Sequence, residues 1–266
     1  DQDRILKPSK RSLGKFEELT WTEALLEVSH KLAHSDGKVG VLLSPQLSNE
    51  SLFIARSFFK DHLKWKNIFL VSPAAPGFQD DILIRADKNP NSKGAEEIGF
   101  SYNDKAASDF LESCKKGEVK GAIIFGQDLE NRFEDKQAVA AIQKLEWSLF
   151  IGSNHNLTSE YATYVLPAVT YIEEEGTFTN FEGRGQKFNK VLEPLEEAKS
   201  VWRILMTLSR ELGIHYHFDR AEEIFRELGL NVPFFKDISY PPEKFPQLAD
   251  AGGQGLCPLF TQDLIL

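Results

Sequence analysis

Short apolar runs that alternate with helix-type patterns constrain the fold of this chain more than any other feature. The runs are Val39–Leu43, Asn67–Val71, Gly121–Phe125, Ser148–Ile151 and Tyr164–Leu166. Continuous apolar runs of this kind are typical of strands that are buried on both faces of a sheet. Their alternation with helical patterns predicts an α/β fold, with a doubly wound, mostly parallel sheet and helices on both faces.

The helices are predicted from their start signals and from apolar residues at helical spacing. Thr20 and Glu23 form a capping box, and a second helix is expected to begin near Ser48. The further predicted helices are Ser108–Lys115, Asp135–Leu145, Glu197–Leu212 and Asp219–Leu228, with Gly213 and Gly229 as C-caps of the last two. Residues 85–105 are rich in proline, glycine and asparagine and are predicted to form a long loop.

Residues 171–194 concentrate special residue types between two strand-forming stretches. Thr177, Phe178 and Thr179 favour a strand, as do Phe188 and Val191. Glycines between and before them permit positive φ or a close backbone approach. We therefore predict a β-hairpin or arch over residues 177–192. It is expected to close around Asn180–Gly185 and to present Asn180, Glu182, Arg184 and Gln186 at its tip.

The order E-x-x-G-T-F-T-N-x-E-G-R-x-Q, from Glu173 to Gln186, resembles the signature of the molybdopterin oxidoreductase superfamily. This superfamily includes formate dehydrogenases and the large peripheral-arm subunit of NADH:quinone oxidoreductase (complex I). The resemblance marks Gly176, Thr177, Asn180, Glu182, Gly183, Arg184 and Gln186 as cofactor-binding residues. Two roles remain open for the hairpin, because it could also serve packing alone in members that bind no cofactor.

Other segments of the chain resemble the same family. Asp3-Arg4 and Asn49-Glu50 are similar to two of its N-terminal motifs. Residues 80–100, with Asn89-Pro90-Asn91 and Gly94-Ala95, are most similar to the complex I branch. The stretches around Val165–Ala168 and Trp202 also fit, so the resemblance extends from residue 1 to about residue 230.

The chain lacks the cysteines that family members use for iron–sulfur clusters. Cys114 and Cys257 are its only cysteines, whereas a cluster normally needs four thiolates. We therefore expect no metal site and no catalytic residue on this chain. The resemblance implies molybdopterin guanine dinucleotide and iron–sulfur clusters elsewhere in an assembly. The short passage from Val71 to Asp80 also replaces a large middle domain of catalytic members.

Net charge and the length of the apolar runs argue against two classes of partner, nucleic acids and the membrane interior. The net charge of −9 argues against non-specific nucleic-acid binding, and no apolar run approaches the roughly 20 residues of a membrane-spanning helix. We predict a cytoplasmic location, on the cytoplasmic or matrix face of an energy-transducing membrane. Attachment there would depend on other subunits of a respiratory oxidoreductase. The predicted organisation is an α/β domain over residues 1–170, the hairpin with its helices over 171–230 and an irregular, extended tail over 231–266.

Several weaker sites have competing interpretations. Gly126–Asp128 follows a strand at a position typical of ligand loops, but no G-x-G-x-x-G surrounds it. Glu173–Glu175 could supply paired carboxylates, although a solvated charge run is the simpler interpretation. His215 and His217 fit a linker better than a metal site. Arg184 is expected to pair with Glu182, Glu173 or Glu175.

Three functional hypotheses follow. The first is a complex I peripheral-arm subunit or fragment, in which a cofactor-type domain serves mainly as scaffold. The second is part of a catalytic molybdopterin enzyme such as formate dehydrogenase, with the dinucleotide against residues 176–186. The third is a non-redox α/β binding module.

Overall fold

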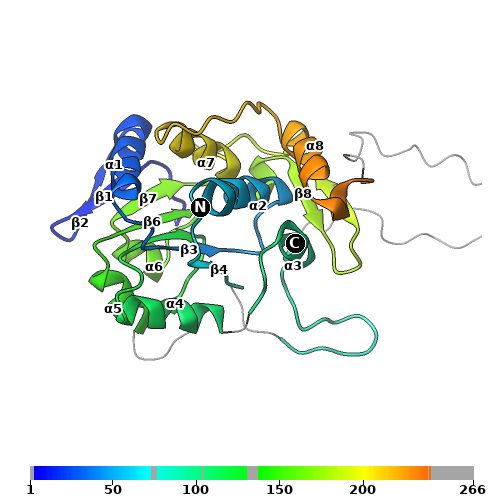
Figure 1. Cartoon of the computed structure of the whole chain (residues 1–266), viewed down its shortest axis with the longest axis horizontal. Coiled ribbons are helices and arrows are strands. Elements are labelled where there is room, and N and C mark those ends of the chain that lie inside the picture. Colours follow the sequence, from blue (N-terminus) through cyan, green and yellow to red (C-terminus); the bar gives the residue numbers. More distant parts are fainter. Residues whose placement is uncertain (1–2, 73–76, 104, 131–136, 239, 241–266) are drawn as a thin grey trace, which may run out of the picture.

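A seven-stranded sheet forms the centre of the molecule, in the order β2-β1-β7-β6-β5-β3-β4 (Figure 1). The structure is a computed structural model that describes residues 3–72, 77–103, 105–130, 137–238 and 240. The strands are β1 (Ser9–Ser12), β2 (Lys15–Glu18), β3 (Val39–Leu43), β4 (Ile68–Leu70), β5 (Gly121–Phe125), β6 (Trp147–Gly152) and β7 (Tyr164–Pro167). Strands β3 to β7 pair in parallel, and β1 pairs antiparallel with both β7 and β2. The predicted α/β fold with a mostly parallel sheet is confirmed.

The strands carry apolar residues on both faces, which explains their continuous hydrophobic runs. In β5, Ile123 and Phe125 face one apolar core, whereas Ala122 and Ile124 face the other. This alternation follows from the two-residue period of a strand. Helices must therefore cover both faces of the sheet.

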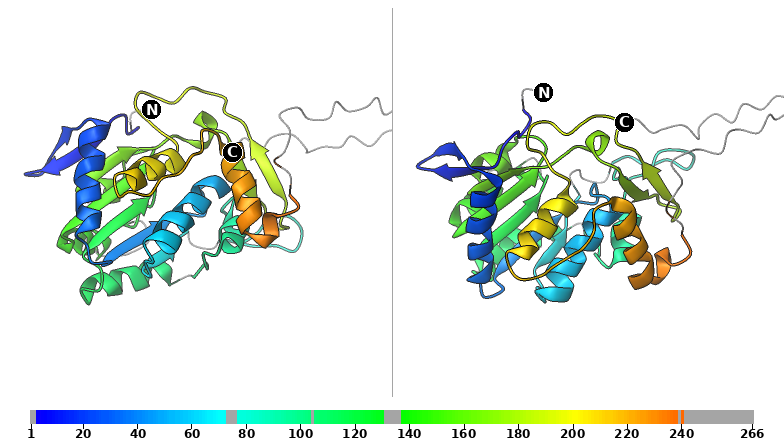
Figure 2. Two further views of the ribbon diagram at one scale, coloured as in Figure 1. Left: turned by 45° about the horizontal axis from the view of Figure 1, so that its top comes forward. Right: turned by 90° about the horizontal axis from the view of Figure 1, so that it is seen from above.

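The helices form one layer on each face of the sheet (Figures 1 and 2). One layer contains α1 (Trp21–Ala33), α2 (Asn49–Ala55), α7 (Val201–Arg210) and α8 (Ala221–Asn231). The opposite layer contains α4 (Ala106–Lys115) and α5 (Gln137–Lys144), and shorter helices are α3 (Ser92–Ile98) and α6 (Leu157–Tyr161). A π-helical segment, η1 (Arg56–His62), continues α2, and the 3-10 turns are η3 (Tyr171–Glu173) and η4 (Pro233–Phe235).

The hairpin stands apart from the main sheet, beside α8 and at the opposite end of the molecule from β1 and β2 (Figure 2). Its strands are β8 (Gly176–Thr179) and β9 (Gly185–Phe188), which pair antiparallel with each other. Phe178 and Phe188 stack on one face of the hairpin, with their ring centroids 4.5 Å apart. The predicted hairpin around Asn180–Gly185 is therefore confirmed.

Two local predictions are wrong. Residues 85–105 contain α3, which begins after Asn91 and ends at Gly99, a residue in the left-handed conformation. Ala95 and Ile98 on this helix are buried in the core, so tertiary packing outweighs the loop-like composition. Gly229 lies inside α8 rather than at its C-cap, because the helix continues to Asn231.

The tail and the N-terminal edge add details that the patterning did not reveal. The β1–β2 hairpin extends the sheet beyond β7 and was not predicted. Val232 and Phe235, in the segment predicted to be extended, are buried beside α8. Residues 241–266 lie outside the described residues, so the division into three regions stays a prediction.

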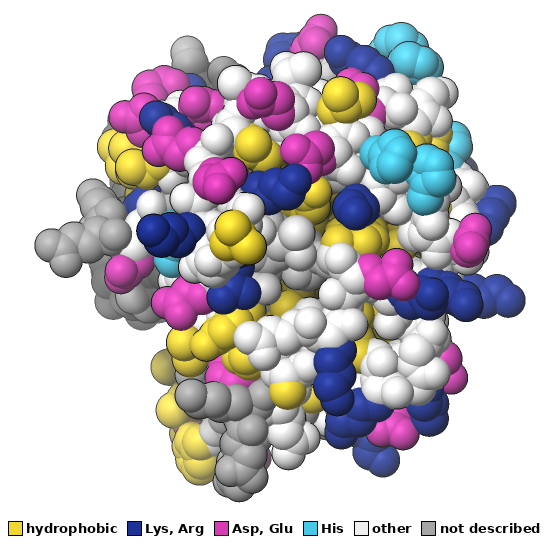
Figure 3. All heavy atoms as spheres, turned by 90° about the vertical axis from the view of Figure 1, so that its left-hand side faces the viewer, with side chains coloured by type: hydrophobic (Ala, Val, Ile, Leu, Met, Phe, Trp, Pro, Cys, Tyr) yellow, Lys and Arg dark blue, Asp and Glu magenta, His cyan; other side chains and the backbone are white. Residues whose placement is uncertain are grey.

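Figure 3 shows the face at the β1–β2 end of the molecule, where acidic and basic side chains are interspersed. Within the residues that the structure describes, no helix is both long and apolar enough to cross a bilayer.

Candidate functional site

Three segments with family resemblance meet at one place in the fold. Ser48 caps α2, and its side chain accepts a hydrogen bond from the Ser51 amide. Asn49 and Glu50 therefore fall in the first turn of the helix, which faces strand β8. Asn91, at the start of α3, contacts the same strand next to Asn49. Asn49, Glu50, Asn91, Thr177 and Thr179 form what we call the hairpin cluster.

Hydrogen bonds join the hairpin to α2. The Thr177 amide donates to Glu50 Oε2 at 2.9 Å, and the Thr177 hydroxyl donates to Glu50 Oε1 at 2.7 Å. Asn49 Nδ2 donates to the hydroxyl oxygens of Thr177 and Thr179, both at 3.0 Å. All four side chains are buried. The amide and the hydroxyl of Thr177 thus supply hydrogen bonds to the buried carboxyl group of Glu50 in place of water.

Asn91 links the hairpin to the loop before α2. The Thr179 amide donates to Asn91 Oδ1 at 2.7 Å, and Asn91 Nδ2 donates to the Leu47 carbonyl at 2.8 Å. Gly176 lets the strand approach the helix, since a Cβ there would lie 3.0 Å from Glu50 Oε2. The cluster therefore fixes the hairpin to α2, to the start of α3 and, through Asn91, to the loop before α2.

Burial controls the charge of Glu50. Removal from water raises the pKa of this carboxyl to about 7, although the hydrogen bonds from Thr177 favour the charged form. The folded state therefore holds a proton that the unfolded chain releases above its ordinary pKa of 4.5. Stability linked to Glu50 is fully present below that value and falls as the pH rises toward 7.

We predict that Glu50→Gln flattens this pH dependence. In the natural chain the Glu50 contribution to the free energy of unfolding should fall by about 3 kcal/mol between pH 4.5 and pH 7. Urea unfolding at several pH values measures this slope. Glu118→Gln, at an exposed position, should leave the slope unchanged. An identical slope in Glu50→Gln and the natural chain would show that Glu50 does not titrate in this range.

A buried ion pair lies at the base of the hairpin. Arg4 Nη1 and Nη2 donate to Glu173 Oε1 and Oε2 at 3.0 and 2.8 Å. The side chains are only 8% and 2% exposed. Burial pushes the pKa of Glu173 upward, but the hydrogen bonds and charge of Arg4 outweigh it, so the pKa lies below its ordinary value. The Asp3-Arg4 motif is thus joined to the signature segment.

The interpretation of Glu173–Glu175 as a solvated charge run is wrong. Glu173 is buried with Arg4, and Oε2 of Glu174 is shielded from water with no hydrogen-bond partner in the described part of the chain. Desolvation raises the pKa of Glu174 to about 8, and the Glu50 and Glu173 carboxyls add to this effect. Glu175 lies 3.7 Å from the Lys187 ammonium.

The tip of the hairpin is held by the side chain of Asn180. Asn180 Oδ1 accepts hydrogen bonds from the amides of Glu182 and Arg184, at 3.0 and 2.9 Å. Gly183 adopts a φ of +85°, which explains the glycine at this turn. The side chains of Glu182, Arg184 and Gln186 are exposed. The seven signature residues therefore divide, with Gly176 and Thr177 in the buried contact and the others at or near the tip.

The predicted pairing of Arg184 with a carboxylate is wrong. Glu173 binds Arg4, Glu175 lies near Lys187, and Arg184 forms no ion pair with any described residue. An exposed, unpaired guanidinium can bind phosphate or carboxylate groups of a ligand.

The weaker candidate sites remain separate from this cluster. Gln127 is fully buried, and its Nε2 donates to the Val71 carbonyl at 2.6 Å. The ligand interpretation of Gly126–Asp128 stays a prediction. Over the described ranges, no group of three or more His, Cys, Asp or Glu side chains is arranged to hold a metal ion, His215 and His217 included.

Comparison with known proteins finds a match to one protein family. Residues 83–211 match the family model described as molybdopterin oxidoreductase. The chain contains a molybdopterin oxidoreductase domain. The chain is 32% identical over 163 residues to a protein named "Putative formate dehydrogenase" from Staphylococcus aureus (strain USA300), covering 59% of this chain and 16% of that protein. A protein of the same description from Staphylococcus haemolyticus (strain JCSC1435) is 28% identical over 171 residues, covering 62% and 17%.

The chain thus spans about a sixth of the length of these relatives. Among solved structures, acetylene hydratase from Pelobacter acetylenicus has the same fold, with a TM-score of 0.57 at 13% identity. The alignment covers 85% of this chain and 64% of that one. The molybdopterin oxidoreductase resemblance is confirmed, whereas no comparison supports the complex I branch in particular.

Sequence reasoning did not place Arg4, Asn49, Glu50 and Asn91 in the site. Each lies in a segment that resembled the family, so the resemblance itself was the available signal. What the sequence lacked was the information that these distant segments meet at the hairpin.

Proposed function

We propose that this chain is part of a molybdopterin-dependent oxidoreductase of the formate dehydrogenase type. The observation that carries this proposal is that one half of the signature hairpin is buried against the domain and the other half is exposed. Its buried half is fixed to α2 and α3 through the hairpin cluster, and its other half presents Arg184, which is exposed and forms no ion pair with any described residue. The chain would form one wall of a cofactor site, and other parts of the enzyme would complete it. The names of the relatives support this choice.

The residues at the hairpin tip fit the phosphates of a pterin dinucleotide, but not the metal. Arg184 offers a guanidinium, and Gln186 an exposed amide, for anionic oxygens. Gly176 and Thr177 contact Glu50 instead. The bound group would supply the redox chemistry. The residues of this chain would orient its phosphates.

The second candidate is a scaffold domain in the peripheral arm of complex I. Two features favour it. The hydroxyl of Thr177, a signature residue, binds Glu50 of the same chain and is not turned toward a ligand, and the chain carries only two cysteines. In either case we propose that other subunits of a respiratory oxidoreductase are the partners. They would hold the chain at the cytoplasmic or matrix face of an energy-transducing membrane.

Capture of the tagged chain from its native cells tests the proposal. We expect the captured complex to contain molybdenum or tungsten and to oxidise formate. Arg184→Gln should lower the pterin content about tenfold, since a charge-assisted hydrogen bond is lost. Arg210→Gln, which changes another exposed arginine, is the control. A complex that oxidises NADH with quinone, without either metal, would contradict the proposal and favour the second candidate.

A further inference from the structure

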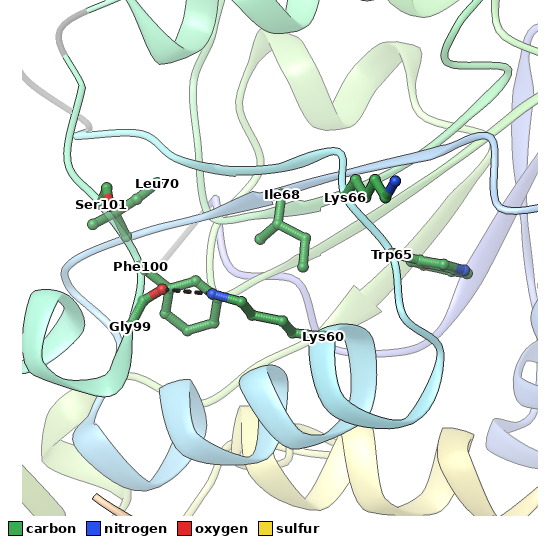
Figure 4. A pocket seen from close by; sticks show the side chains of 8 residues that line it. All are labelled: Lys60, Trp65, Lys66, Ile68, Leu70, Gly99, Phe100 and Ser101. Carbon is green, nitrogen blue, oxygen red and sulfur yellow. Dashed lines mark hydrogen bonds between the residues drawn. The ribbon is translucent and has the colours of Figure 1, made fainter. Parts of the chain in front are cut away.

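A pocket of about 360 Å³ lies at the β4 edge of the sheet, outside the hairpin cluster (Figure 4). It is bounded by η1, by the segment that leads into β4 and by the turn after α3. Its volume lies within the range of about 300–1,000 Å³ that is typical of small-molecule sites. The lining residues are Lys60, Trp65, Lys66, Ile68, Leu70, Gly99, Phe100 and Ser101.

The lining has an apolar part that is held in place by the core. Leu70 and Phe100 are 2% and 5% exposed. Trp65 stacks on the buried Phe59, with ring centroids 5.5 Å apart and an interplanar angle of 17°. Ile68 projects into the space between the strand and the helix in Figure 4. Leu70 and Phe100 thus form a nearly buried floor, and the partly exposed Trp65 and Ile68 offer contact area to an apolar group.

The charged part of the lining is cationic. The Lys60 ammonium donates to the Gly99 carbonyl at 3.1 Å, which leaves it further N–H donors. Asp61, the acidic neighbour of Lys60 in sequence, lies 3.5 Å from Arg56. Neither Lys60 nor Lys66 forms an ion pair with any residue that the structure places. A chain with a net charge of −9 thus carries two unneutralised ammonium groups at one pocket.

The helix beside the pocket has an unusual geometry. The Leu63 amide donates to the Phe58 carbonyl at 3.0 Å, a five-residue step instead of the four-residue step of an α-helix. Such π-helical turns are rare and often occur at functional sites. Lys60 lies within this turn.

We propose that this pocket binds a small organic anion with an apolar body and a carboxylate head. The body would lie on Trp65 and Ile68, and the head would bind the ammonium group of Lys60. This ammonium group reaches toward Gly99 in Figure 4, whereas Lys66 extends toward the other end of the pocket. The cationic part or the apolar part of the lining alone would bind a ligand weakly, because exposed ion pairs contribute little and the apolar surface is small. Their combination in one pocket selects a ligand that has both.

Titration of the full chain with octanoate, followed by the amide NMR signals of Gly99, Phe100 and Ser101, tests this site. Octan-1-ol has the same apolar body without the charge, and propionate has the same head with a shorter body. We expect saturable shifts with octanoate and at least about fivefold weaker binding of both controls. Equal binding of octanoate and octan-1-ol would overturn the proposal.

Variants connect the binding to the two lysines. Lys60→Gln should weaken octanoate binding about threefold to fivefold. Lys66→Gln, at the other end of the pocket in Figure 4, should weaken it less. Lys31→Gln, an exposed lysine on α1, should have no effect. Since both pocket lysines are exposed, the variants should fold normally, and unchanged amide spectra away from the pocket verify this. Unchanged octanoate affinity in Lys60→Gln, or shifts confined to other parts of the chain, would refute the site.

Discussion

Arg4→Ala is expected to destabilise the protein by about 3–5 kcal/mol, because it leaves the Glu173 carboxylate buried without a partner. The change also removes the hydrogen bond from Arg4 Nε to the Ser153 carbonyl. Urea unfolding at pH 7 measures the loss. The difference should shrink at acidic pH, because the pKa of Glu173 lies below its ordinary value in the natural chain and the pair is lost when this carboxyl is protonated.

Lys7→Ala is the matched control for this prediction. Lys7 lies in the same N-terminal segment and pairs with Glu18, but both side chains are exposed. Its removal should barely change the urea midpoint, since exposed pairs contribute little. The double variant Arg4→Met/Glu173→Leu should recover much of the stability, because it removes both buried charges. A midpoint for Arg4→Ala equal to that of Lys7→Ala would refute the buried ion pair.

Gly94→Ala is expected to destabilise the protein by about 2–3 kcal/mol or more, through a collision inside the hairpin cluster. A Cβ at this position would lie 2.1 Å from Asn49 Oδ1 and 2.2 Å from Asn91 Oδ1. Both amides are buried and hold β8, so their displacement breaks hydrogen bonds to Thr177 and Thr179. Thermal unfolding should therefore show a lower Tm.

Gly77→Ala is the control for the glycine prediction. The described atoms nearest to a Cβ at Gly77 belong to the Lys88 side chain, with Cε at 2.6 Å, and this exposed side chain can move away. Its Tm should therefore stay near that of the natural chain. If Gly94→Ala unfolds at the same temperature as Gly77→Ala, the contact between α3 and the hairpin is looser than described.

Much of the fold could be predicted because its signals are local. The strands Val39–Leu43 and Gly121–Phe125 are continuous apolar runs, and the Thr20–Glu23 capping box forms as expected. The helix α3 was missed because its stability comes from buried contacts of Ala95 and Ile98, not from its composition. β1 and β2 were missed because they are short strands with largely polar residues.

The candidate site was only half predictable. The hairpin and its tip follow from local turn chemistry, such as Asn180 and Gly183. The carboxylate of Glu50 is separated from Thr177 by more than a hundred residues, and no local pattern indicates that contact. Arg4 and Glu173 are also far apart in the sequence, and no local pattern indicates their contact. Glu173 was therefore predicted as a partner of Arg184, whereas it binds Arg4.

Amide hydrogen exchange at the hairpin tests the central claim most directly. The Thr177 and Thr179 amides donate to buried side chains of Glu50 and Asn91, whereas the Glu182 amide donates to Asn180 at the exposed tip. We expect the two threonine amides to exchange only with global unfolding and the Glu182 amide to exchange far faster. Exchange of Thr177 and Thr179 as fast as that of Glu182 would show that the signature hairpin is not fixed to the domain.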